Sequence, residues 1–141
     1  MASDPVISLS YNDGGIGKTL QELSRRSRDL VPPLKNAREI ILLAIDQGFE
    51  QERSPDGIPW KPNSPYTTAR KRAEGRILKI NQLTGRMRAS INGQITGDKL
   101  VVGTNVAYAA ARQRVNPFLG ISKEAQEEIA QEFADYLEGD L

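Results

Sequence analysis

The segment between residues 14 and 19 holds the residues with the clearest chemical potential. Three glycines precede Lys18 and Thr19, so the stretch ends in Gly-Lys-Thr, as a phosphate-binding loop does. In such a loop, backbone N–H groups surround the phosphates, the lysine reaches the outer phosphates and the threonine binds magnesium. The full motif requires glycine five positions before Gly17, where this chain has Asn12. We therefore expect a glycine-rich turn before a helix, with a small nucleotide-binding module as the alternative.

Other common catalytic groups are missing from the composition. The 141 residues contain no cysteine and no histidine, which excludes Ser-His-Asp triads, Cys-His pairs and cysteine/histidine zinc sites. The neighbouring carboxylates of Glu127 and Glu128 diverge on a helix and cannot share one site. No run of about 18 apolar residues predicts a membrane span. The sequence thus predicts a protein that is not an enzyme, with no cofactor, no metal and no membrane partner.

Charge is distributed unevenly, although the net charge is only +1. Residues 61–88 contain eight basic residues against Glu74 alone, a local charge of +7, whereas residues 122–141 contain seven acidic residues against Lys123, a local charge of −6. Two separate solvated surfaces would account for this pattern. Opposite patches would also favour head-to-tail contacts between copies. Non-specific nucleic-acid binding by the basic segment is a further alternative.

The first half of the chain predicts one strand and three helices. Residues 6–11 are typical of a strand, and a short helix follows over residues 18–29. Apolar residues at helical spacing predict a central core helix over residues 33–51, with two prolines in its first turn. Prolines in residues 54–65 exclude regular structure, and we expect Trp60 to anchor this loop on the domain. Ser64 then caps a short basic helix that runs to about Arg72.

The second half predicts a hairpin between short helices. Residues 77–80 read as a strand or an extended segment, and Thr84 can cap a helix over residues 85–90, where Leu83, Met87 and Ile91 recur at fourfold spacing. Gly97-Asp98 forms a turn between strands 92–96 and 100–104, and a small helix follows over residues 106–112. Ser122 caps a last helix that Gly139 ends. Its expected buried residues are Ala125, Ile129, Phe133, Tyr136 and Leu137.

These elements predict an α+β fold, in which a small antiparallel sheet packs with two main helices and short extra helices. We expect a single domain over residues 1–141. Its N-terminal part, residues 1–31, carries the first strand and short helix, and residues 53–65 form the proline-rich loop.

Four segments, in order, resemble the phage virion morphogenesis family, the tail-completion proteins of Mu-like and related contractile-tailed phages. Residues 56–67 are similar to the family's D-G-x-P-W-x-P-L-S-x-x-T, and residues 77–91 to I-L-x-x-T-G-x-L-x-x-S-I. Residues 100–109 are similar to V-x-V-G-T-N-x-x-Y-A, and residues 117–122 to P-F-L-G-[LI]-S. The likeness spans roughly residues 34–138 and leaves the Gly14–Thr19 segment outside. The segment 111–116 departs from the family, whose members usually have a His-Gln pair and a longer loop there.

The resemblance implies a structural virion protein in the tail or neck, assembled in the bacterial host cytoplasm. It would complete the tail at its head-proximal end, support head–tail joining, and assemble as a homo-oligomeric ring, for which a hexamer matches the tail's symmetry. Implied partners are tail tube or sheath proteins and head–tail connector proteins, with at most weak contact to passing DNA. The candidate assembly contacts are Trp60, Lys61, Arg70, Lys71, Arg72, Arg86, Arg88, Arg112, Arg114 and Phe118.

Overall fold

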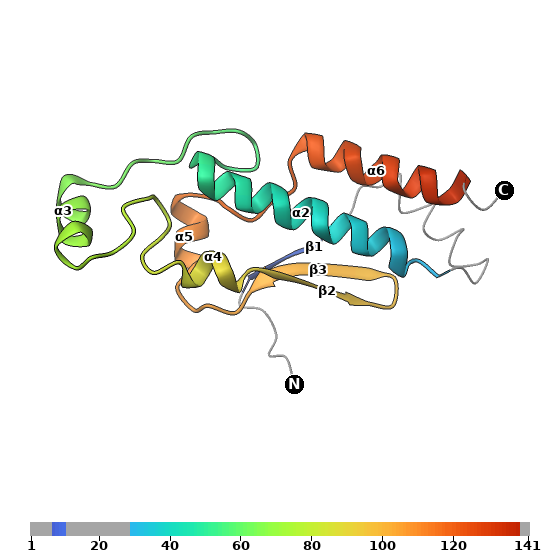
Figure 1. Cartoon of the computed structure of the whole chain (residues 1–141), viewed down its shortest axis with the longest axis horizontal. Coiled ribbons are helices and arrows are strands. Elements are labelled where there is room, and N and C mark those ends of the chain that lie inside the picture. Colours follow the sequence, from blue (N-terminus) through green and yellow to red (C-terminus); the bar gives the residue numbers. More distant parts are fainter. Residues whose placement is uncertain (1–6, 11–28, 139–141) are drawn as a thin grey trace.

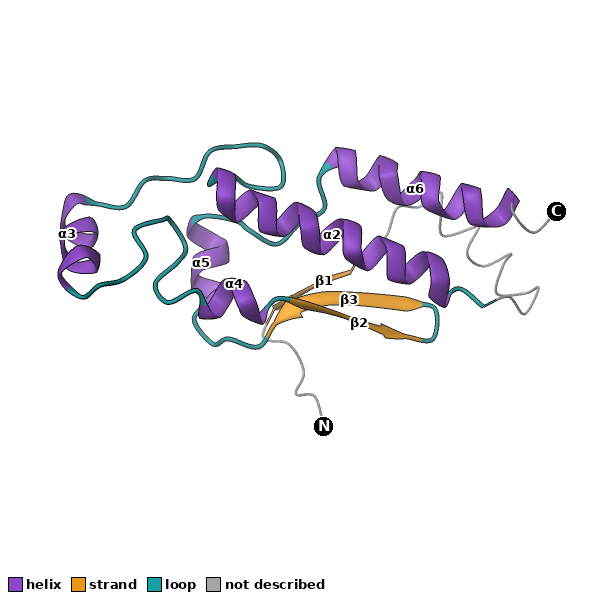
Figure 2. Cartoon of the chain, viewed as in Figure 1, coloured by secondary structure: helices purple, strands orange, loops and turns teal. Residues whose placement is uncertain are grey.

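The computed structural model describes residues 7–10 and 29–138. Its elements, in chain order, are β1 (Ile7–Ser10), α2 (Val31–Gln51), α3 (Pro65–Ala73), α4 (Arg86–Ser90), β2 (Asn92–Thr96), β3 (Lys99–Thr104), α5 (Ala109–Val115) and α6 (Lys123–Glu138). The three strands form one antiparallel sheet in the order β1-β3-β2. The predicted α+β class is therefore confirmed (Figures 1 and 2).

The long helix α2 organises the core. It contacts both α6 and the β2–β3 hairpin, and α6 runs antiparallel beside it (Figure 1). One stripe of α2 is buried at helical spacing, as predicted, and the helix begins two residues earlier than expected because both prolines fit its first turn. The core joins this stripe to residues of β3, α6 and the loops. The most deeply buried large side chains are Phe49, Ile129 and Val102.

Local signals for turns and caps are confirmed at three places. The hydroxyl of Ser64 accepts a hydrogen bond from the N–H of Thr67 at 3.1 Å, at the start of α3. Ser122 accepts from the N–H of Ala125 at 3.1 Å, at the start of α6. Gly97 has a φ of 62°, a left-handed conformation that suits glycine in the two-residue turn of the hairpin. Two serine side chains and the backbone freedom of one glycine thus place these three element boundaries.

Two predicted details need correction, and one open alternative is decided. The small helix expected at 106–112 lies at Ala109–Val115, because Val106 is buried in the core and its N–H donates to the hydroxyl of Thr104 at 3.2 Å. Gly85, not Thr84, is the N-cap of α4, although the Thr84 hydroxyl accepts from the N–H of Arg86 at 3.4 Å. Residues 77–80 join no strand, in keeping with the extended alternative.

On α6, Ala125, Ile129 and Phe133 are buried as predicted. Tyr136 is half-buried, and its hydroxyl donates to the backbone carbonyl of Asp29. The Leu137 side chain, Gly139, the Gly14–Thr19 segment and the helix expected at 18–29, except for its last residue, lie outside the described residues.

Candidate assembly surface

The basic segment forms an arm at one end of the molecule. We call residues 61–88 the basic arm; it contains α3, and two long loops connect that helix to α2 and α4 (Figure 1). Lys71 is the one residue among the nine of α3 that is buried. A helix without a buried apolar stripe gains little from packing, so the arm must be held by specific polar contacts.

Aromatic packing and one hydrogen bond fix the base of the arm. The Trp60 ring lies edge-on to Phe49, with centroids 5.4 Å apart, and Phe118 lies 5.5 Å from the same ring. The indole N–H of Trp60 donates to the backbone carbonyl of Pro117 at 2.7 Å. Trp60 and Phe118 are 5% and 2% exposed. Both were candidate contacts; the structure places them in the core, where they support the surface from within.

Asn116 holds the next residue of the arm through its backbone. The Asn116 carboxamide accepts a hydrogen bond from the N–H of Lys61 at 2.8 Å and donates to the carbonyl of Lys61 at 3.1 Å. The Asn116 carbonyl in turn accepts from the carboxamide of Asn81 at 2.9 Å. This pairing fixes the Lys61 backbone while its side chain remains exposed.

Lys71, another candidate contact, points inward. Its ammonium group donates to the carbonyl oxygens of Lys79 at 2.9 Å and Gln82 at 2.7 Å, which ties α3 to the following loop. Burial lowers the pKa of the Lys71 ammonium below its ordinary value; the guanidinium of Arg112 lowers it further, and Glu52 partly opposes both. Lys71 therefore stabilises the arm internally.

Arg88 joins the arm to α2. Its guanidinium donates to the carboxylates of Asp46 and Glu50, at 2.7 Å each, and its Cζ atom lies 5.8 Å from the centroid of the Phe49 ring. These bonds lower the pKa of both carboxyl groups and raise the pKa of Arg88. The ammonium group of Lys79 also forms an ion pair with the Glu50 carboxylate, at 3.2 Å. Arg88 and Lys79 thus hold the arm against α2 of the same subunit.

The remaining candidate cations differ in how available they are. Arg70 is exposed but forms an i,i+4 pair with Glu74 at 3.0 Å, and a solvent-exposed pair of this kind contributes little to stability. Arg112 is half-buried and donates to the Asn81 carboxamide at 2.7 Å. Four candidates are exposed and make no ion pair with any described residue: Lys61, Arg72, Arg86 and Arg114.

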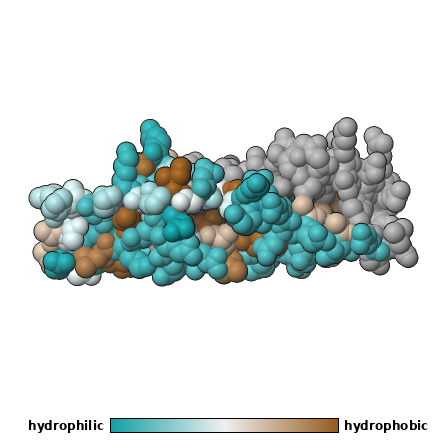
Figure 3. Space-filling model, turned by 90° about the horizontal axis from the view of Figure 1, so that it is seen from above, coloured by the Kyte–Doolittle hydropathy of each residue, from teal (hydrophilic) through white to brown (hydrophobic). Residues whose placement is uncertain are grey.

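Exposed apolar side chains accompany these cations, and the sequence reasoning did not single them out as a surface. Tyr66 on α3 is 74% exposed, and Leu83, which shares the spacing of Met87 and Ile91, is 50% exposed. Leu78, Tyr108 and Val115 are also large, apolar and exposed. Figure 3 shows hydrophobic areas among hydrophilic ones toward the end that carries α3. Apolar residues beside arginines are typical of protein–protein contacts. The one signal of this surface in the sequence was Tyr66, an isolated tyrosine in an otherwise polar helix.

Comparison with known proteins decides the family. The sequence model of the phage virion morphogenesis family matches residues 12–116, more than half of the chain. The chain belongs to the phage virion morphogenesis family. It therefore has a role in the assembly of phage particles. No curated protein and no solved structure that was compared with the chain matches it.

The match corrects the extent of the resemblance. It begins at Asn12, so Gly14–Thr19 lies inside the region shared with the virion morphogenesis family, contrary to the expectation from the four segments. It includes the whole basic arm and ends at Asn116, before residues 117–122 and α6. The nucleotide-binding alternative depends on residues 14–19, which lie outside the described part of the chain, and stays untested.

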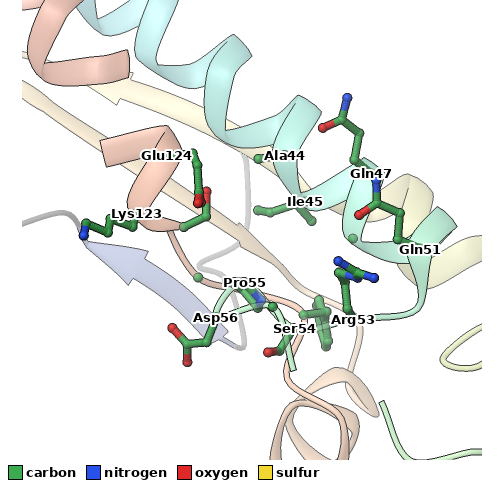
Figure 4. Close-up of a pocket in the computed structure, with 15 residues that line it drawn as sticks. Ala44, Ile45, Gln47, Gln51, Arg53, Ser54, Pro55, Asp56, Lys123 and Glu124 are labelled. Carbon is green, nitrogen blue, oxygen red and sulfur yellow. The ribbon is translucent and has the colours of Figure 1, made fainter. Parts of the chain in front are cut away.

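A groove of about 590 Å³ in this virion morphogenesis protein lies away from the arm. It runs between the end of α2, the turn at residues 53–57 and the start of α6 (Figure 4). Arg53, Asp56, Lys123 and Glu124 are spread around it and do not converge on one point (Figure 4). At its edge, a Cβ at Gly120 would lie 2.6 Å from the Pro55 side chain, so glycine permits this close approach.

Within residues 7–10 and 29–138, no group of three acidic residues is placed to hold a metal ion. No helix of the described part has the length and apolar content to cross a membrane.

Proposed function

We propose that this protein completes the phage tail at its head-proximal end and supports the joining of tail to head. It acts as a homo-oligomeric ring, through contacts rather than catalysis. Tail tube or sheath proteins and head–tail connector proteins are its partners in the virion. Membership of the virion morphogenesis family and the four sequence segments described above support this role.

One structural observation carries the proposal: the basic arm and the acidic helix occupy different parts of the same subunit. Along the longest axis of the molecule, α3 lies at one end and the last turn of α6 at the other (Figure 1). A closed ring repeats one heterologous interface, so each subunit needs two different and complementary patches. The exposed cations of the arm and the exposed acids of α6 provide two patches of opposite charge. These acids are Glu124, Glu127 and Glu128 near the start of the helix and Asp135 and Glu138 near its end.

The arm also has the composition of a protein contact. Its cations stand beside exposed tyrosine and leucine side chains, and arginine and tyrosine are enriched at protein interfaces. Lys71 and Arg88 hold this surface in shape from beneath. A preformed surface binds with a smaller ordering cost than a mobile one.

The test is to remove the gene from the phage that encodes this protein and to supply the protein from a plasmid. Without the protein, we expect free heads and unjoined tails by electron microscopy, and wild-type protein should restore infectious particles. Mass spectrometry of purified virions should detect the chain. Normal infectious particles without the protein, or complete virions that never contain it, would contradict the proposal.

A further inference from the structure

A small cavity of about 160 Å³ lies between the arm and α5. Its polar lining includes Lys71, Gln82 and Arg112, while Leu83 and Tyr108 contribute exposed apolar surface. Because a water molecule occupies about 30 Å³ in the liquid, the space corresponds to about five waters. It therefore has room for a side chain from a partner.

Gln82 has an unsatisfied donor in this lining. The residue is 7% exposed, and its buried Nε2 amide makes no hydrogen bond with any described residue. A buried donor without a hydrogen-bond partner is destabilising, so native proteins rarely keep one without a reason. A partner that brings an oxygen atom into the cavity would satisfy it.

The cavity is positively charged. Two cations, Lys71 and Arg112, line it, and none of the residues that line the space is acidic. Lys71 donates two hydrogen bonds to carbonyl oxygens, and Arg112 donates one through Nε to Asn81. An ammonium has three donors and a guanidinium five, so both groups have donors left for an anion. Glu52, the acid that acts on Lys71, accepts from the N–H of Ile80 at 3.1 Å and lies outside the lining.

We propose that this cavity receives the carboxylate of Glu127 or Glu128 from α6 of a second copy of this chain. The inference rests on the proposed function and deepens it by naming the contact between neighbouring subunits. No residue of α6 lines the cavity of its own subunit. Glu127 and Glu128 are exposed and make no ion pair with a described residue. Charge complementarity therefore favours an intermolecular pairing, with Leu83 and Tyr108 at the edge to exclude water.

The first test separates stability from association. In Gln82→Met the unsatisfied amide is gone but the side-chain length is kept, so the free energy of unfolding should stay equal or rise. Self-association, measured by analytical ultracentrifugation, should weaken at least about tenfold, since a buried contact to a charged group is lost. Unchanged association would overturn the proposal, and so would a parallel loss of stability and association.

The second test exchanges charges between the two sides. Arg112→Glu alone, and Glu127→Arg with Glu128→Arg alone, should each fail to associate, whereas an equal mixture of the two proteins should associate again. Lys99→Glu is the control, because it makes the same charge change at an exposed site on the hairpin. A mixture that remains dissociated, or an equal defect in Lys99→Glu, would overturn the pairing.

A third measurement examines assembled particles directly. The chain contains no cysteine, so a disulfide can arise only from introduced residues. Tails that incorporate Tyr108→Cys together with Glu127→Cys or Glu128→Cys should yield linked dimers on oxidation, and either cysteine alone should yield none. If wild-type protein enters virions but no such link forms, the cavity assignment fails and the proposed function stands. If Arg112→Glu blocks incorporation without weakening self-association, the occupant belongs to another tail protein. If the protein neither self-associates nor enters virions, both proposals fail.

Discussion

The Lys71 ammonium donates a hydrogen bond to the backbone carbonyl of Gln82 at 2.7 Å, across eleven positions of the chain. A second bond, to the carbonyl of Lys79 at 2.9 Å, closes the loop that follows α3. Because no other residue of α3 is buried, this lysine is the main internal anchor of the helix. The arm therefore depends on a buried cation at its centre, while neighbouring cations on the same helix remain at its surface.

Replacing Lys71 with methionine should destabilise the protein by about 2 kcal/mol, because the two carbonyl oxygens lose their donor. The matched control is Arg72→Met on the exposed side of α3, for which a change within about 0.5 kcal/mol is expected. Urea unfolding measures both. Equal effects of the two substitutions would contradict the internal role of Lys71.

Trp60→Phe should lower the free energy of unfolding by about 1–3 kcal/mol. Phenylalanine fills part of the space but cannot donate to the carbonyl of Pro117, which would then lack its partner. Tyr66→Phe, a change at an exposed ring, should leave the unfolding midpoint unchanged. A stable Trp60→Phe protein would show that the indole hydrogen bond does not anchor the arm.

Asn116→Asp should destabilise the fold by about 2–3 kcal/mol at neutral pH. The carboxylate can still accept from the N–H of Lys61 but cannot donate to its carbonyl, and the site is 3% exposed. Asn92→Asp on the exposed edge of β2 is the comparison. Thermal unfolding above and below the pKa of the new carboxyl should show a larger defect when it is ionised; the same defect at both pH values would count against this account.

The Arg88 cluster predicts acid sensitivity. The pKa values of Asp46 and Glu50 lie below their ordinary values of 3.8 and 4.5 in the folded protein, chiefly through hydrogen bonds from Arg88. These interactions contribute their full stability at pH values above the pKa of each carboxyl group in the unfolded chain. That stability is lost as the pH falls through the lower pKa values of the folded protein. As the pH drops below about 5, wild-type stability should therefore fall more steeply than that of Arg88→Met. Urea unfolding at each pH measures the stability of both proteins. An equal fall in wild type and in Arg88→Met would refute the role of the Arg88 cluster in acid sensitivity.

The exposed cations of the arm should matter for assembly and not for folding. Arg72→Glu combined with Arg86→Glu should change stability by no more than about 0.5 kcal/mol per site, because neither side chain has an ion-pair partner among the described residues. Incorporation into tails should fall, whereas Lys35→Glu combined with Lys99→Glu should have no effect. If both double variants entered tails equally well, the arm would not be part of the assembly surface.

Sequence patterns were sufficient where the physical cause is local. The apolar stripe of α2, the Ser64 and Ser122 caps and the Gly97-Asp98 turn each depend on residues within a few positions of one another. Val106 shows the limit: its burial, a tertiary effect, delays the start of α5 by three residues from the predicted position. Local pattern thus gave the α+β class and most of the elements.

The candidate surface was harder to predict because its side chains face partners that are distant in sequence. Nothing in the sequence around Lys71 distinguishes it from Arg70 or Arg72, since its acceptors are backbone carbonyls that every residue possesses. Leu83 has the spacing of a buried stripe but is half-exposed. Charge counting located the arm correctly, yet only the structure separates the cations that hold it from those that are free to bind.

The most direct test of the central claim is to locate the protein on purified tails by immunogold electron microscopy. The account predicts label at the end of the tail that joins the head, on unjoined tails as well as in complete virions, and loss of that label with the Arg72→Glu, Arg86→Glu variant. Label along the shaft, at the distal end, or on no part of the particle would contradict it.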